Sequence, residues 1–182
     1  MCGIAGIIGD RRVNSDAVEH MNTLQEHRGP DDSGIWKSAN GSVVLGHQRL
    51  SIIDISTAGH QPMEIGSQVI TYNGEIYNFS KLRKQLSSLG SRFKSNSDTE
   101  VILEAYKKWG IDCLLYLEGM FSFVIFDKKK DQILAVRDRL GIKPLHYTIL
   151  KDKILISSEV KSIIFMHYYG LIETVKKKFR MY

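Results

Sequence analysis

Several short segments of this chain are apolar at almost every position, and they limit the folds that it can adopt. The longest is residues 120–126 (MFSFVIF), and residues 4–8 and 69–72 are similar. A strand with one face in water alternates polar and apolar residues, whereas a strand covered on both faces is apolar throughout. We therefore expect an α+β fold in which two sheets pack together and helices flank them.

The residues between these segments predict further strands and three helices. Apolar side chains recur on one face over residues 15–26, with Ser15 as the N-cap, and again over residues 79–89. Residues 97–100 (SDTE) have capping-box spacing and open a third helix that ends at Gly110. Additional strands are expected at residues 43–45, 132–136, 145–150 and 153–157.

Charge and cysteine content exclude several classes of protein. Four of the five net positive charges come from the segment after residue 150, and we therefore expect no nucleic-acid partner, which would need a basic folded face. Cys2 and Cys113 have no zinc-type spacing and form no disulfide framework, so neither a metal nor a cofactor is expected. No signal peptide and no apolar run of about 18 residues is present. We expect a cytoplasmic protein without a membrane partner.

Cys2 directly follows the initiator methionine, and this position allows an unusual chemistry. Removal of Met1 leaves a residue with both a thiol and a free α-amino group. That amine titrates near ~7.7–8.0, so it is able to accept the proton of its own thiol. The alternative is a small buried cysteine that opens a core strand.

Eight different short motifs follow one another along the chain. They are residues 2–6 (CGIAG), 27–31 (HRGPD), 46–54 (GHQRLSIID), 72–78 (YNGEIYN), 97–100 (SDTE), 117–123 (LEGMFSF), 137–145 (RDRLGIKPL) and 157–161 (SSEVK). Together they resemble the class II glutamine amidotransferase domain of glutamine-hydrolysing asparagine synthetases. The resemblance implies a four-layer αββα sandwich of mostly antiparallel sheets, the fold of N-terminal-nucleophile hydrolases. It covers residues 1–164.

The resemblance implies a glutaminase that converts glutamine to glutamate and ammonia through a Cys2 thioester, as one half of asparagine biosynthesis. Asn73 and Gly74 match the residues that supply the oxyanion hole, with the Asn73 side-chain amide and the Gly74 backbone N–H as donors. Without the resemblance, an Asn-Gly pair after a strand is read as a hairpin turn.

The family's substrate-binding residues match a second set of positions. Arg49 matches the residue that binds the α-carboxylate of glutamine, and Asp98 matches the one that binds the α-ammonium, with Glu75 as a second contact. The backbones of Leu50 and Ile52 line the same pocket. The alternatives are a surface charge for Arg49 and a helix-dipole interaction for Asp98.

The remaining polar residues of the motifs are predicted to be structural. His27, Arg28 and Asp31 are interpreted as an ion-paired loop near the active site, and Asp138 and Arg139 as part of a buried turn. Loop positions with ordinary hydrogen bonds are expected for His47 and His60, and an inert core position for Cys113.

The chain departs from the family after residue 164. The Ser-Gly-Gly-x-Asp-Ser loop that binds ATP in the family's synthetase domain is absent, and residues 165–182 form a basic, aromatic tail that no longer resembles the family. We expect glutamine as the substrate, with a separate ATP-dependent synthetase as a candidate partner. The alternative is a truncated or non-catalytic glutaminase-like subunit that docks on such a synthetase.

Overall fold

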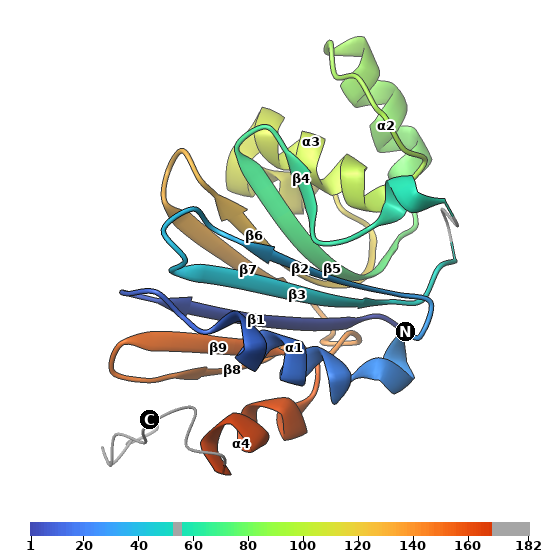
Figure 1. Ribbon diagram of the computed structural model, residues 1–182. Helices are drawn as coiled ribbons and strands as arrows, with labels where there is room; N and C mark the ends of the chain where they lie inside the picture. The colour runs from blue at the N-terminus through green and yellow to red at the C-terminus, as the bar shows by residue number, and fades with distance from the viewer. Residues whose placement is uncertain (53–55, 169–182) are drawn as a thin grey trace.

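Two antiparallel sheets face each other at the centre of the molecule, with helices on both outer sides (Figure 1). The computed structural model describes residues 1–52 and 56–168. Five strands form one sheet in the order β2-β3-β1-β9-β8: β2 (Asp32–Lys37), β3 (Val43–Arg49), β1 (Gly3–Gly9), β9 (Lys153–Ser157) and β8 (His146–Ile149). Four strands form the other in the order β4-β5-β6-β7: β4 (Met63–Ile65), β5 (Gln68–Ile76), β6 (Gly119–Asp127) and β7 (Gln132–Arg137).

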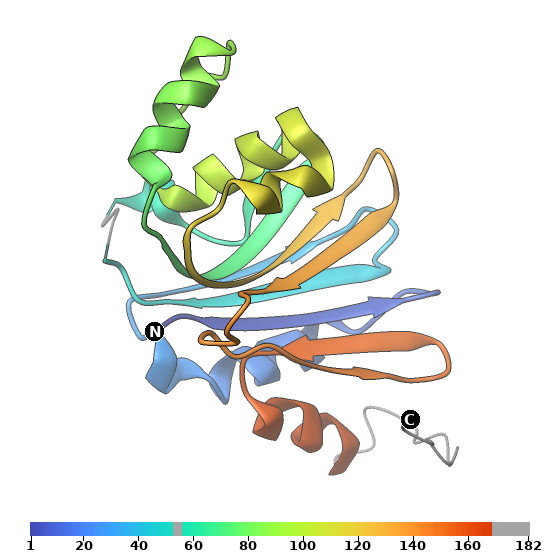
Figure 2. The same cartoon turned by 180° about the vertical axis from the view of Figure 1, so that it is seen from behind.

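The helices form the two outer layers. Helices α1 (Ser15–Thr23) and α4 (Val160–Tyr168) cover the five-stranded sheet, and α2 (Phe79–Ser88) and α3 (Asp98–Trp109) lie beyond the four-stranded sheet, as the opposite views in Figures 1 and 2 agree. Short 3-10 helices occur at η1 (Glu26–Arg28), η2 (Thr57–Gly59) and η3 (Gly110–Leu115). This arrangement confirms the predicted four-layer αββα sandwich.

Three clusters of buried apolar side chains hold the layers together. The cluster between the sheets includes Leu45, Val69 and Val124, none of which is exposed to solvent. A larger cluster joins the four-stranded sheet to α2 and α3, and a third joins the five-stranded sheet to α1 and α4. Burial of each large side chain stabilises the fold by about 1.5–3 kcal/mol, and sheets with two covered faces account for strands that are apolar throughout.

The apolar pattern holds less well at the sheet edges. Tyr147 and Ile149 on edge strand β8 are 69% and 57% exposed. Strands β2 and β4 and helix α4 were not predicted at all. Strand β2 is polar at both ends and lies at an edge, and β4 has only three residues, so neither carries a periodic signal.

The N-termini of helices α1 and α3 differ in detail from the predictions. Helix α1 is shorter than residues 15–26, and its N-cap is Asn14, whose side chain accepts from Asp16 N, rather than Ser15. Ser97 does cap α3 by accepting from Thr99 N. The Glu100 carboxylate does not return to Ser97, however, because it accepts from the backbone of the preceding loop; the capping box is therefore half formed.

Strand register brings distant motifs to one edge of the sandwich. Gly3 at the start of β1 pairs with Gln48 near the end of β3, so the residues just outside both strands are neighbours. Asn73 and Gly74 lie inside β5, where they pair with Ser122 and Phe121 of β6. The Asn-Gly pair is thus part of a strand, and the hairpin-turn alternative is wrong.

Candidate active site

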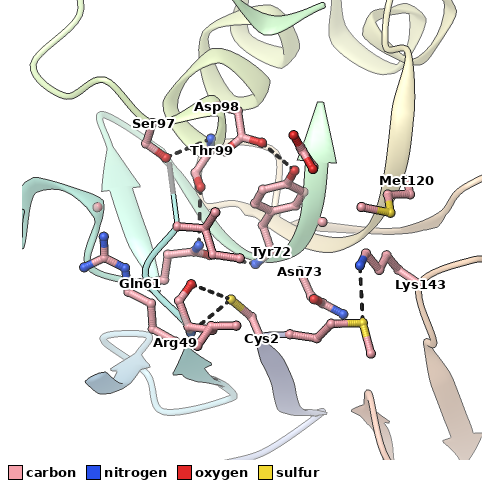
Figure 3. Close-up of a pocket in the computed structure, with 16 residues that line it drawn as sticks. Cys2, Arg49, Gln61, Tyr72, Asn73, Ser97, Asp98, Thr99, Met120 and Lys143 are labelled. Carbon is pink, nitrogen blue, oxygen red and sulfur yellow. Dashed lines mark hydrogen bonds between the residues drawn. The ribbon is translucent and has the colours of Figure 1, made fainter. Parts of the chain in front are cut away.

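A pocket opens where β1 begins and β3 ends, and every predicted site residue lines it (Figure 3). These residues are Cys2, Arg49, Leu50, Ile52, Asn73, Gly74, Glu75 and Asp98. They come from the N-terminus, β3 and the segment after it, β5, and the first turn of α3. The structure therefore brings together side chains that are up to 96 positions apart in the sequence, from Cys2 to Asp98.

Cys2 is held on both its backbone and its sulfur. The Sγ atom accepts from Leu50 N at 3.3 Å, and Arg28 Nε donates to the Cys2 carbonyl oxygen at 2.9 Å. Arg28 is fixed in turn by an ion pair with Glu159 at 2.7 Å. Burial raises the pKa of the Cys2 thiol, although the Leu50 N–H and the Arg49 charge oppose this effect. The thiol consequently needs a base before it reacts.

Asn73 and Gly74 offer hydrogen-bond donors beside the sulfur. Among the residues that the structure describes, Asn73 Nδ2 is buried and has no hydrogen-bond partner. A buried donor without a partner costs about 1–3 kcal/mol, so this amide nitrogen is able to donate to an acceptor that enters the pocket. A Cβ atom at Gly74 would lie 2.4 Å from Met120 O, so only glycine fits here.

Arg49 and Asp98 place opposite charges in the same pocket. The Arg49 side chain is 8% exposed and donates from Nη1 to Ser56 O at 3.0 Å, so the surface-charge alternative is wrong. Asp98 is 4% exposed, and its Oδ2 accepts from Tyr72 Oη at 2.7 Å and from Ile76 N at 3.0 Å. Burial raises the pKa of Asp98, and these two donors oppose the rise.

The other predicted residues lie at the rim. Glu75 is exposed, Leu50 is half-buried, and the Ile52 side chain is 73% exposed. Only the backbone of Ile52 is therefore suited to line the pocket. Residues 53 and 54, the end of the same motif, lie outside the described residues, as does residue 55.

Comparison with known proteins agrees with this geometry. A family model described as a glutamine amidotransferase domain matches residues 1–178. The chain belongs to this family. A match of that extent does not locate the end of the domain, so the boundary at residue 164 stays a prediction, and residues 169–182 of the predicted tail lie outside the described residues.

Its relatives are longer proteins. The chain is 40% identical over 196 residues to a putative glutamine-hydrolysing asparagine synthetase 2 of Methanocaldococcus jannaschii, covering 97% of this chain and 38% of that protein. It is also 40% identical to asparagine synthetase 3 of Bacillus subtilis, covering 90% of this chain and 27% of the relative. These matches confirm the predicted resemblance to the glutaminase part of asparagine synthetases.

Solved structures confirm the fold. The glutamine phosphoribosylpyrophosphate amidotransferase from B. subtilis, complexed with ADP and GMP, superimposes with a TM-score of 0.78 at 23% identity. The match covers 90% of this chain and 43% of the other. At this identity the likeness concerns the fold alone. Within the described part of this amidotransferase domain, no helix is both long and apolar enough to span a bilayer.

Sequence reasoning missed several residues that line the pocket of this amidotransferase domain. They are Gly59, Gln61, Tyr72, Ser97, Thr99, Met120 and Lys143, together with Met1 itself. Tyr72, Ser97 and Thr99 are sequence neighbours of predicted site residues. Their positions could therefore have indicated that they line the same pocket. Lys143 lies within the 137–145 motif but was not assigned to the site, whereas Gln61 lies on a loop outside all of the motifs. Lys143 Nζ donates to Met1 Sδ at 3.3 Å, so the methionine side chain lies against a buried ammonium inside the pocket.

Most of the residues predicted to be structural are so. Asp31 accepts from Ser51 N, and His27 lies 3.6 Å from Glu159, beside the Arg28 ion pair. Cys113 is fully buried, and burial raises its pKa to about 12. Arg139 is exposed, so the prediction of a buried turn holds for Asp138 but not for its neighbour.

The two histidines differ from each other. His60 Nδ1 lies 2.6 Å from Asp32 Oδ2 in a partly exposed loop, as predicted. His47 is not in a loop but inside β3, fully buried between the sheets, where its Nε2 lies 2.9 Å from Tyr72 O. Burial lowers the pKa of His47 to about 4, so the imidazole is neutral at pH 7 and donates to that carbonyl.

Proposed function

We propose that this domain hydrolyses the side-chain amide of glutamine to glutamate and ammonia, with Cys2 as the nucleophile. One observation carries the proposal: a cysteine sulfur, an unpaired buried amide donor, a guanidinium and a carboxylate line a single pocket. These are the groups needed to attack an amide and to hold the two charged ends of an amino acid.

The proposed reaction begins once Met1 has been removed. The freed α-amino group of Cys2 accepts the thiol proton, and the thiolate attacks the amide carbon of glutamine to give a tetrahedral oxyanion. The C–N bond then breaks, the amine returns the proton to the leaving group, and ammonia departs. Water hydrolyses the resulting thioester to glutamate and restores the thiol.

Asn73 and Gly74 are proposed to stabilise the oxyanion. The unpaired Nδ2 of Asn73 is already aligned by strand β5, so it needs no reorganisation when the negative charge develops. The Gly74 backbone N–H is the second proposed donor, and the absence of a Cβ lets the strand approach β6 closely.

Glutamine is proposed to bind by both of its charged ends. Arg49 binds the α-carboxylate, since a planar guanidinium offers two parallel donors. Asp98 binds the α-ammonium, with the exposed Glu75 as an outer contact, and the backbones of Leu50 and Ile52 close the side of the pocket.

Glutamate release from glutamine tests this proposal. The protein is first checked by mass for loss of Met1, and Cys2→Ala is expected to abolish turnover. Cys113→Ala is the matched control, because Cys113 is the other free cysteine and is buried in η3. Equal turnover by the Cys2 variant and the wild type would refute the nucleophile assignment.

We also propose that the ammonia is used by an ATP-dependent synthetase unit to make asparagine from aspartate in the cytoplasm. The names of the two relatives and the 40% identities support the acceptor chemistry. The free thiols of Cys2 and Cys113 are suited to a reducing compartment. Transfer of an isotope label from the glutamine side-chain amide into asparagine, with ATP, aspartate and a synthetase unit present, tests the acceptor.

A further inference from the structure

We propose that Tyr72 is a positioning residue that makes this site select substrates with an α-ammonium group, and that it acts through Asp98. The inference rests on the proposed function and deepens it, because it assigns the origin of selectivity at one end of the glutamine pocket.

The contact between the two residues is direct and shielded from water. Tyr72 Oη donates to Asp98 Oδ2 at 2.7 Å, and the two residues are 3% and 4% exposed. Ile76 N donates to the same oxygen at 3.0 Å. The carboxylate is therefore fixed by two donors from strand β5, although it belongs to helix α3.

The backbone of Tyr72 is fixed as firmly as its side chain. Its N–H donates to Gln61 Oε1 at 2.7 Å, and its carbonyl oxygen lies 2.9 Å from His47 Nε2. Figure 3 shows the ring of Tyr72 between Asp98 and Cys2. The next residue of the strand is Asn73. Tyr72 therefore fixes the position of the Asp98 carboxylate relative to the Asn73 amide, the proposed oxyanion donor.

The hydrogen bond also keeps the carboxylate charged. Burial favours the neutral acid, and the tyrosine hydroxyl opposes this because it donates to the ionised form. Burial and the Asp98 charge raise the pKa of Tyr72 well above its ordinary value, so the hydroxyl keeps its proton across the neutral range. Without that donor, Asp98 would become neutral at a higher pH and would lose its attraction for an ammonium group.

Other charged and titratable groups face Asp98 and must be kept constant in a test. They are Cys2 from the N-terminus, Arg49 from β3, Glu75 from β5 and Lys143 from the loop before β8. Tyr72→Phe removes one oxygen, keeps the ring in the core and leaves all four groups in place. A change in pH dependence in this variant therefore reports the Tyr72–Asp98 contact.

The experiment compares two substrates in the wild type and in Tyr72→Phe. Glutamine carries the α-ammonium, and glutaramate has the same amide and carboxylate but lacks it. Loss of a hydrogen bond to a charged group is expected to raise KM for glutamine about tenfold, with kcat changed less than about twofold. KM for glutaramate should stay within about twofold. The ratio of kcat/KM for glutamine to kcat/KM for glutaramate, from which the titration of the Cys2 amine cancels, should fall at a higher pH than in the wild type.

Two controls separate this role from a general structural one. Tyr106→Phe removes a hydroxyl from another largely buried tyrosine, on α3, and should change neither KM. In an Asp98→Asn background, Tyr72→Phe should cause no further loss of selectivity. Equal KM increases for both substrates in Tyr72→Phe, or a substrate ratio of kcat/KM with the same pH dependence as in the wild type, would overturn the inference. A wild type without glutamine turnover would instead refute the proposed function.

Discussion

Asn73 holds its side-chain nitrogen in the pocket without a partner, and this single atom allows a direct test of transition-state stabilisation. Asn73→Ala is expected to lower kcat by about 10²–10³-fold, because the donor is needed only when the oxyanion forms. KM should change by no more than a few-fold, since glutamine is held in the ground state mainly through its α-carboxylate and α-ammonium groups. Steady-state glutamate release measures both constants.

Asn73→Asp completes that test at the same residue. The substitution keeps the size of the side chain and replaces the donor with an acceptor, so the loss in kcat should be at least as large as in the alanine variant. Retention of full kcat in either variant would show that the oxyanion is stabilised by other groups.

The turn between β7 and β8 is the clearest example of stabilisation by one side chain at the scale of an element. The Asp138 carboxylate accepts backbone N–H bonds from residues 121, 140, 142 and 143. Although burial opposes the charge, these donors lower the pKa of Asp138 below its ordinary value. One ionised side chain thus orders the loop that carries Lys143 into the pocket.

Asp138→Asn is expected to lower the free energy of unfolding by about 1.5–3 kcal/mol at pH 7, the usual value of hydrogen bonds to a charged group. A depressed pKa stabilises the fold above the pKa of the unfolded state, about 3.9 for Asp, and that stabilisation disappears as pH falls through the folded pKa. Denaturant titrations should therefore show a difference at pH 7 that shrinks below about pH 4. The exposed Asp112→Asn variant is the control and should match the wild type at both pH values.

The elements themselves show why part of the site was predictable. Strand β6 is apolar over most of its length, and the mainly apolar residues 69–72 mark the first part of β5, which continues through Asn73 and Gly74. Gln61 reaches the pocket on a loop, where its Oε1 accepts from Tyr72 N of a neighbouring strand. No local sequence pattern encodes such a contact. The edge strand β2 was not predicted either, because its polar ends give it no periodic apolar pattern.

At the scale of the whole molecule, the central strand of the five-stranded sheet, β1, begins at the pocket. Strand β1 is the middle strand of the five-stranded sheet and pairs with β3 and β9. Cys2 therefore directly precedes a strand that is hydrogen-bonded on both sides. Arg28 and Glu159, from opposite ends of the chain, fix the Cys2 carbonyl from outside. The backbone of Cys2 is thus held by Arg28 while Cys2 lines the pocket.

This placement predicts that retention of Met1 switches the domain off without unfolding it. With Met1 present, the Cys2 nitrogen is an amide that cannot act as a base, and the methionine side chain contacts Lys143 inside the pocket. Protein made while deformylation is inhibited keeps its formyl-methionine, and its glutamate release should fall by at least about 10²-fold, the usual contribution of a general base. Its melting temperature should match that of the processed form, because the layers and their cores are unchanged. Treatment with deformylase and methionine aminopeptidase should restore turnover, and full activity before that treatment would exclude the α-amino group as the base.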